Sequence, residues 1–373
     1  MKTPNRRLPI INGRIIARCA ALAIWCIAAR HLSADTIGPI SELEYRYVTS
    51  DVSGSHTTTP GVSVFGLNHD GVGDLVFLTT PTTGIRGTGS LLQTGRHVLT
   101  AAHVVTNANT NVIGSFLSGT IKFETTSGSV IIPYQSITVD PLYNGDATEG
   151  HDIAIVTLSQ TAPIFVPRYE IYRGNAEIGV DSIKVGYGQS GIGTTGTSIL
   201  SGTKRAGKNE YDVDARSVLS ALGSGVNPFD GGALPGVGLS LAYDFDDGTV
   251  TRNAMDGYFP IDFNSDLGFG VDEVNSAPGD SGGPTFIIDS GIFKIAGVTS
   301  YGFGFNGNPD ISPGTNSSFG EIAVDMRVAA EQIFIDGAIP EPGSCVLMAI
   351  GIGLLCCRYR PARLNLTIDD GQR

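Results

Sequence analysis

Short apolar runs alternate with clusters of glycine, proline, asparagine and threonine along most of the chain. Runs of this kind, bounded by turn-forming residues, predict β-strands. Many short strands with frequent turns are typical of a mainly β protein, either a sandwich or a pair of barrels. The expected strands are Leu75–Leu78, Ser90–Leu92, His97–Thr100, Val130–Ile132, Ile153–Leu158, Ile183–Val185, Thr285–Ile288 and Ile295–Thr299.

Helical spacing of apolar residues is scarce. In the segment Val324–Ile335, Val324, Val328 and Ile335 alternate with charged residues, which predicts a short helix near the C-terminus. Residues 190–275 form the least regular segment, with glycine-rich stretches and several aspartates. We interpret this segment as an irregular insertion of long loops between strands.

Composition and charge limit the kinds of function that the protein can have. Of the 373 residues, 50 are glycine and only 16% are charged, which agrees with a turn-rich β protein. The 36 acidic residues exceed the 24 basic ones and give a net charge of −12. Such a surface repels nucleic acid and anionic lipid headgroups, so the sequence argues against a nucleic-acid partner.

The N-terminal segment has the features of an export signal. Residues 1–34 contain basic but no acidic residues, and an apolar run from Cys19 to Ala29 precedes a small residue at Ala34. We expect a signal peptide over residues 1–34, removed by signal peptidase. The alternative, a membrane anchor, needs about 20 apolar residues and the run is shorter. Residues 35–73 are polar and turn-rich, and we interpret them as an N-terminal arm.

Three short segments carry residue types that fit nucleophilic catalysis. His103 follows the apolar strand that ends in Thr100-Ala101-Ala102, Asp152 precedes another strand, and Ser281 lies in the turn Gly279-Asp280-Ser281-Gly282-Gly283-Pro284. A serine hydroxyl needs an imidazole to take its proton, and the imidazole needs a carboxylate on its other nitrogen. Ser281 is therefore the candidate nucleophile, His103 the general base and Asp152 the orienting acid, with Asp146 as a nearby competitor. The N–H groups of Gly279 and Ser281 are candidates for an oxyanion hole.

Each of these residues alone also has a structural interpretation, namely a core histidine, a strand-end cap and a turn serine. The three motifs together resemble those of the trypsin/chymotrypsin-like serine proteases, in the same order. Gly186-Tyr187-Gly188 and Gly297–Gly302 also resemble strand segments of that family, and the similarity runs from about Asp74 to Ile335.

The resemblance implies two six-stranded antiparallel β-barrels with a short C-terminal helix over residues 74–336. It implies peptide-bond hydrolysis through an acyl-enzyme, with a protein or peptide as substrate. Two alternatives stay open: a catalytically silent binding module with the protease fold, and a surface structural protein.

The resemblance also assigns substrate-binding positions. It places Asn275 and Ser276 at the base of the primary pocket, with Ser300, Tyr301 and Gly302 along its wall and Gly320 as a further candidate. Asn275 is neutral and lacks the charge that selects Lys or Arg, so we expect a neutral or apolar preference at the cleaved bond. The chain departs from the family at Thr88 and Val104, where cysteines are common. It also has no Ile-Val-Gly-Gly-like start, which leaves the partner of Asp280 undetermined.

Four oxygen-bearing residues also fit the spacing of a calcium loop. Asp262, Asn264, Asp266 and Glu273 repeat the oxygen spacing of such a loop. Leu267 occupies the position where the tight turn needs glycine, so a solvated acidic loop is the alternative. We expect no other cofactor.

The C-terminal segment, residues 337–373, resembles the bacterial PEP-CTERM sorting signal. Pro340-Glu341-Pro342 precedes an apolar run from Cys345 to Cys357 and then a basic cluster. The resemblance implies a Gram-negative bacterium, transient membrane association and processing by an exosortase-like enzyme. It also implies an exported protein at the cell surface, in the outer envelope or outside the cell. An ordinary C-terminal anchor is the alternative.

Overall fold

The computed structural model describes residues 35–37, 48–49, 57–214, 238–258 and 263–339. The expected export signal, most of the expected sorting segment and Asp262 lie outside these described residues. The chain divides into two compact units, residues 1–332 and 333–373. The strands of both barrels lie in the first unit, and the short helix α4 (Gln332–Ala338) crosses the boundary.

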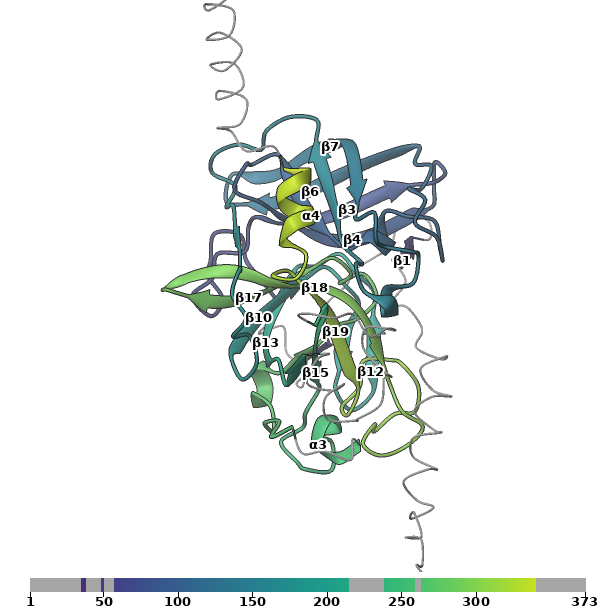
Figure 1. Ribbon diagram of the computed structural model, residues 1–373, viewed down its shortest axis with the longest axis vertical. Coiled ribbons are helices and arrows are strands. Elements are labelled where there is room, and N and C mark those ends of the chain that lie inside the picture. Colours follow the sequence, from purple (N-terminus) through teal and green to yellow (C-terminus); the bar gives the residue numbers. More distant parts are fainter. Residues whose placement is uncertain (1–34, 38–47, 50–56, 215–237, 259–262, 340–373) are drawn as a thin grey trace, which may run out of the picture. The chain divides into compact units, whose positions relative to one another are not determined.

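Six antiparallel strands close into the first barrel (Figure 1). They run in the order β4-β3-β6-β7-β8-β5, and pairing between β4 and β5 closes the ring. A further short strand, β1 (Asp35–Ile37), pairs with one end of β4. The six barrel strands are β3 (Val72–Leu78), β4 (Gly84–Leu91), β5 (His97–Thr100), β6 (Ser118–Thr125), β7 (Gly128–Val139) and β8 (Ala154–Leu158).

Side chains from these strands fill the barrel interior. On β6, Ile121 and Phe123 are fully buried while the residues between them are partly exposed, which is the alternation expected of a strand with one face in the core. Phe77 of β3 packs edge-on against Tyr134 of β7, with ring centroids 5.5 Å apart. The first barrel is therefore a packed core that gives its rim a rigid base.

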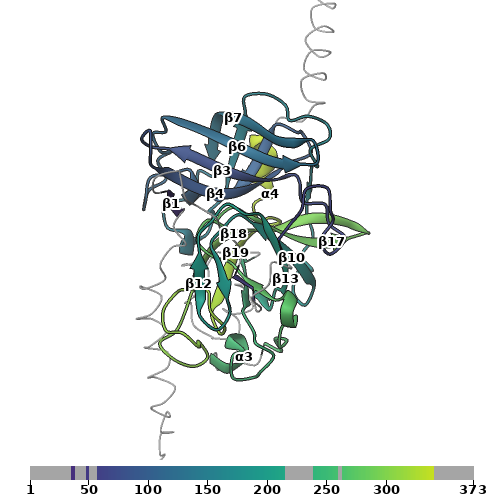
Figure 2. The same ribbon diagram turned by 180° about the vertical axis from the view of Figure 1, so that it is seen from behind.

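The second sheet is an open half-barrel with the order β13-β10-β17-β18-β19-β15-β14 (Figure 2). A small third sheet has the order β12-β11-β2-β16. The half-barrel strands are β10 (Asp181–Gly186), β13 (Arg205–Glu210), β14 (Val213–Asp214), β15 (Ser240–Asp244), β17 (Pro284–Asp289), β18 (Ile292–Phe303) and β19 (Ile322–Arg327), with β9 (Glu170–Ile171) paired to β18. The third sheet comprises β2 (Val48–Thr49), β11 (Ser190–Ile192), β12 (Gly196–Ile199) and β16 (Val274–Asn275).

A buried ion pair lies inside the half-barrel. Lys184 Nζ is 3.4 Å from Asp325 Oδ2 and 3.4 Å from the ring centroid of Tyr243. Asp325 Oδ2 also accepts hydrogen bonds from Tyr211 Oη and Thr285 Oγ1, both at 2.5 Å. Burial lowers the pKa of Lys184 to about 8, despite the neighbouring carboxylate. Lys184 and Asp325 are thus paired and hydrogen-bonded, as buried charges must be.

Two predictions about secondary structure were wrong. Residues 190–275 are not a run of loops, because the described part contains strands β11 to β16, including the half-barrel strands β13 and β15. The expected helix at Val324–Ile335 begins only at Gln332, and residues 322–327 form strand β19. Every residue of β19 is buried between β18 and β15, so its charged residues face protein partners rather than solvent.

The fold class itself is confirmed. The described residues form a mainly β protein with one closed six-strand barrel and one half-barrel, consistent with a trypsin-like double barrel. The described helices are all short: α3 (Ala254–Tyr258), α4 and the 3-10 turns η3 (Ala102–Val104), η4 (Ala147–Glu149) and η5 (Gly270–Asp272). Within the described part of the chain, no helix is long and apolar enough to cross a membrane.

Candidate active site

Strand pairing in the first barrel brings His103 and Asp152 together. Strand β5 leads into η3, which carries His103, and Asp152 lies two residues before β8. The two strands are antiparallel, with Thr100 opposite Ala154, so these flanking residues meet at one rim of the barrel. The backbone N–H of His103 donates to Asp152 Oδ1 at 2.8 Å, and His103 Nδ1 lies 2.6 Å from Asp152 Oδ2.

Asp152 is a fully buried carboxylate held in its charged form. Burial alone would raise its pKa, but the charge and hydrogen bonds of His103, with a hydrogen bond from Ser300, outweigh burial and lower the pKa below its ordinary value. Ser300 Oγ donates to Asp152 Oδ2 at 2.5 Å. Because a carboxylate only accepts hydrogen bonds, we assign the imidazole proton to His103 Nδ1, which leaves a lone pair on Nε2.

The competing acid, Asp146, has a different role. Its side chain caps η4, and Oδ1 accepts hydrogen bonds from Thr148 N at 2.9 Å and Thr148 Oγ1 at 2.6 Å. An aspartate in this position satisfies a backbone N–H that a short helix leaves unpaired. Asp146 is therefore a capping residue, while Asp152 is the acid beside His103.

The turn that carries Ser281 packs against the residues that lead to His103. Gly282 N donates to Thr299 O at 2.8 Å, and Thr88 N donates to Ser281 O at 2.8 Å. A Cβ atom on Gly282 would come within 2.0 Å of Thr100 Oγ1 and 2.8 Å of Ala101 N. His103 Nε2 is buried and accepts no hydrogen bond among the described residues.

Thr88 has a role that no local sequence pattern predicts. Its Oγ1 donates to Gly279 O at 3.0 Å and accepts a hydrogen bond from Tyr187 N at 3.1 Å. The hydroxyl thus ties β4 of the first barrel to the serine turn and to the strand end at Gly186–Gly188. The hydrogen bond from Thr88 goes to the carbonyl oxygen of Gly279, so the N–H of Gly279 takes no part in it.

The partner of Asp280 is a pair of backbone N–H groups. Gly188 N donates to Asp280 Oδ1 at 2.6 Å, and Ala277 N donates to Oδ2 at 3.0 Å. Burial raises the pKa of Asp280 to about 8, although these hydrogen bonds act in the opposite direction. A Cβ on Gly188 would lie 2.4 Å from the Asp280 carboxyl carbon, so glycine is needed for the approach.

The expected pocket residues are buried in two separate segments. Asn275 ends β16, and its side-chain oxygen accepts a hydrogen bond from Ser276 N at 2.9 Å. Ser317 Oγ donates to Ser276 O at 2.7 Å.

The expected wall residues Ser300, Tyr301 and Gly302 follow one another on β18, and Ser300 is the member that contacts Asp152. Gly320 lies in a turn against Pro309, where a Cβ would come within 2.2 Å of the Pro309 carbonyl oxygen.

Two of the four expected calcium ligands lie in a larger group of acidic residues. Asp246 interacts electrostatically with both of them and with two more carboxyls, those of Asp212 and Asp244. Burial raises the pKa of Asp244 to about 7 and that of Asp246 to about 11, and neighbouring carboxyls contribute to both increases.

Glu273 Oε1 accepts a hydrogen bond from Asn209, and Oε2 accepts one from Phe269 N, both at 2.7 Å. Asn264 has a left-handed backbone, with φ of 56°.

Comparison with known proteins adds one finding. The Trypsin family model matches residues 75–221, a range that contains His103 and Asp152 and ends before Ser281. No curated protein matches the chain. The family-model match over this part of the chain agrees with the closed barrel and the half-barrel, and both support a trypsin-like fold.

Proposed function

We propose that the protein is an exported serine endopeptidase that uses Ser281, His103 and Asp152. The observation that carries the proposal is the 2.6 Å contact between His103 Nδ1 and the buried Asp152 carboxylate. This contact leaves Nε2 available as a base, and the residues just before His103 pack against the turn that carries the serine. The fold match supports a protein or peptide as the substrate.

In the proposed reaction, Ser281 Oγ attacks the carbonyl carbon of the scissile peptide bond while His103 Nε2 takes its proton. The N–H groups of Gly279 and Ser281 donate hydrogen bonds to the oxyanion that forms. The imidazolium then protonates the leaving amine, and an ester on Ser281 remains. Water attacks this ester with His103 again as the base, which releases the carboxylic acid product and returns the proton to Ser281.

Asp152 and Ser300 act through His103 in this scheme. Asp152 has a lowered pKa and stays charged at neutral pH, so it stabilises the imidazolium in the transition state. Ser300 donates to the same carboxylate oxygen and fixes its orientation. We infer that Ser300 is a positioning residue as well as part of the substrate site.

A fluorophosphonate probe on the purified protein tests the proposed nucleophile. We expect covalent labelling of the wild type, no labelling of Ser281→Ala, and unchanged labelling of Ser290→Ala. Ser290 is a matched control because it lies in the exposed hairpin turn between β17 and β18. Equal labelling of folded Ser281→Ala and wild type would contradict the assignment. No labelling of a folded wild type would favour a silent binding module.

We further propose a preference for neutral or apolar residues before the cleaved bond. The reason is the neutral Asn275 at the position that the resemblance gives to the pocket base, where a carboxylate would favour Lys or Arg. Cleavage of a mixed peptide library, read by mass spectrometry, measures the preference directly. A profile dominated by Lys or Arg would overturn this part of the proposal.

Export and C-terminal sorting remain proposals that rest on the two terminal segments. The chain has one tryptophan, Trp25, and it lies in the proposed signal. Intact-mass analysis of protein from the native host should show loss of Trp25 and of the three C-terminal cysteines. A mass that retains either segment would instead indicate a lasting membrane anchor at that end.

A further inference from the structure

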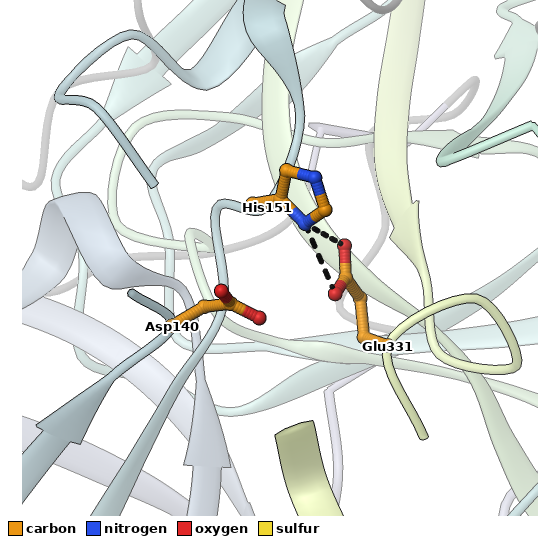
Figure 3. Close-up of side chains that lie close together, drawn as sticks. All are labelled: Asp140, His151 and Glu331. Atoms are coloured by element: carbon orange, nitrogen blue, oxygen red, sulfur yellow. Dashed lines mark hydrogen bonds and ion pairs between the residues drawn. The ribbon is translucent and has the colours of Figure 1, made fainter. Parts of the chain in front are cut away.

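Three side chains with metal-binding groups meet next to the proposed catalytic acid. Asp140 directly follows β7, His151 directly precedes Asp152, and Glu331 lies between β19 and α4. One ligand atom from each side chain lies within 4.8 Å of the other two. Figure 3 shows the three side chains converging on one space from three separate segments of the chain.

Backbone hydrogen bonds fix the segments that present these side chains. Asp140 N donates to Ile153 O at 3.1 Å, and Ile153 N donates to His151 O at 2.7 Å. Glu331 N donates to Val328 O at 3.1 Å. The arrangement is therefore part of the folded barrel and not a chance approach of exposed side chains.

The charges in this cluster do not balance. Asp140 and Glu331 are each only 3% exposed, and the one basic group among the three is the imidazole of His151. Nδ1 of His151 lies 3.0 Å from Glu331 Oε1 and 3.2 Å from Oε2, and its hydrogen bond goes to Oε2. Glu331 Oε1 is buried and accepts no hydrogen bond among the described residues.

We propose that Asp140, His151 and Glu331 bind a divalent transition-metal ion of the Zn²⁺ type. One imidazole nitrogen with two carboxylate oxygens suits this borderline ion, whereas Ca²⁺ and Mg²⁺ prefer oxygen ligands alone. Bonds of about 2.0–2.2 Å place neighbouring ligand atoms of a tetrahedral site about 3.3 Å apart. The separations of 3.0 and 3.2 Å between His151 and Glu331 are close to that value.

The site would have three protein ligands and one open position for water. The His151 side chain is 15% exposed and gives the ion a route from solvent, while the two carboxylates are almost closed off. A bound ion would compensate the negative charge of the two buried carboxylates. It would also fix the residue next to Asp152, so its main effect is on the stability of this part of the fold.

The test is Zn²⁺ titration of the purified full chain by calorimetry, with thermal unfolding as a second readout. The cysteines are alkylated in every sample, because thiolates also bind Zn²⁺. The site variants are His151→Gln and Asp140→Asn. Glu149→Gln is the matched control, since it removes a carboxylate from the same loop but outside the cluster.

We expect the wild type and Glu149→Gln to bind one more Zn²⁺ ion than His151→Gln. Asp140→Asn should bind that ion at least about tenfold more weakly. At saturating Zn²⁺ the wild-type Tm should rise by about 5 °C, and the rise should be lost in His151→Gln. Equal binding and equal Tm shifts in the wild type and either folded site variant would overturn the proposal.

Co²⁺ binding to the alkylated wild type gives a result that does not depend on folding of a variant. We expect visible absorption bands that indicate nitrogen and oxygen ligands, and we expect Zn²⁺ to displace them. No Co²⁺ or Zn²⁺ uptake by the folded wild type would show that the three residues form an ion pair only, and the proposal would fail.

Discussion

At the scale of single residues, Asp152 is distinguished by the number of groups that hold it. Its two oxygens receive the backbone N–H of His103, the imidazole Nδ1 and the Ser300 hydroxyl. A buried carboxylate without such donors would become protonated, because burial disfavours the charged form. The hydrogen bonds keep the charge that the proposed imidazolium requires.

Substitution of the two neighbouring aspartates should separate catalysis from capping. Asp152→Asn should lower kcat by about 10⁴-fold, as in other enzymes with this triad, because the amide can hold the wrong imidazole tautomer. Asp146→Asn should keep nearly full activity, since asparagine also caps helices well. Steady-state kinetics on one peptide substrate measures both effects. Similar activity losses in the two variants would contradict the assignment of Asp152.

The identity of the candidate residues could be predicted from sequence, but their partners could not. His103, Asp152 and Ser281 lie in motifs that the chemistry constrains, so local sequence reveals them. Thr88 forms hydrogen bonds with residues about 100 and 191 positions away, and no local pattern marks it. His151 and Glu331 are 180 positions apart, so only the folded structure brings the proposed metal ligands together.

At the scale of elements, the serine turn depends on glycines with left-handed backbones. Gly279 has φ of 95° and Gly282 has φ of 82°, a region that other residues rarely adopt. Gly282 is also enclosed, with Thr100 Oγ1 at 2.0 Å and Thr88 O at 2.3 Å from a hypothetical Cβ. The turn therefore needs glycine both for its backbone angle and for its contact with the first barrel.

Two glycines with the same backbone angle should respond differently to alanine. Gly282→Ala should destabilise the protein by more than about 3 kcal/mol and abolish labelling by a fluorophosphonate probe, because strain and a backbone clash combine. Gly291, in the β17–β18 turn, has φ of 81° but no atom within 4 Å of a hypothetical Cβ. Gly291→Ala should cost only about 1–2 kcal/mol and keep labelling.

Urea denaturation and probe labelling of both variants measure these effects. Gly282→Ala with normal stability and normal labelling would show that the turn can move without loss of function. That result would contradict the tight packing between the serine turn and the first barrel.

Prediction of elements succeeded where a strand is an apolar run and failed where a buried strand carries polar or charged residues. The strand His97–Thr100 agrees with the structure at both ends. Strand β13 contains Arg205, Lys208 and Asn209, and these polar residues hid the strand pattern. Asn209 is buried and donates a hydrogen bond to the Asp244 carbonyl oxygen. Strand β19 failed for the same reason, since Asp325 pairs with Lys184 in the core.

At the scale of the whole molecule, the excess of acidic residues extends into the interior. The chain has a net charge of −12, and carboxyls in the half-barrel are buried close together. Burial raises the pKa of Glu273 and Asp212 well above their ordinary values, and neighbouring carboxyls raise both further. The folded protein thus retains protons that the unfolded chain would release at neutral pH.

Retained protons make the stability of the protein depend on pH. Asp246 has a folded-state pKa of about 11, compared with an ordinary value of 3.8. The contribution of Asp246 to the free energy of unfolding is fully present below pH 3.8 and is lost as pH rises towards 11. Between these values only the unfolded chain releases the proton. Each such group lowers the free energy of unfolding by up to about 1.4 kcal/mol per pH unit.

Asp246→Asn should therefore reduce the loss of stability between pH 5 and pH 9, since the amide has no proton to release. Asp247→Asn is the matched control, because Asp247 is the next residue and is exposed. The measurement is urea unfolding at pH 5, 7 and 9, in a Ser281→Ala background that prevents self-cleavage. We expect the control to retain the wild-type dependence on pH and Asp246→Asn to show a flatter one. The same pH dependence in all three proteins would show that Asp246 is ionised in the folded state, which its burial beside other carboxyls argues against.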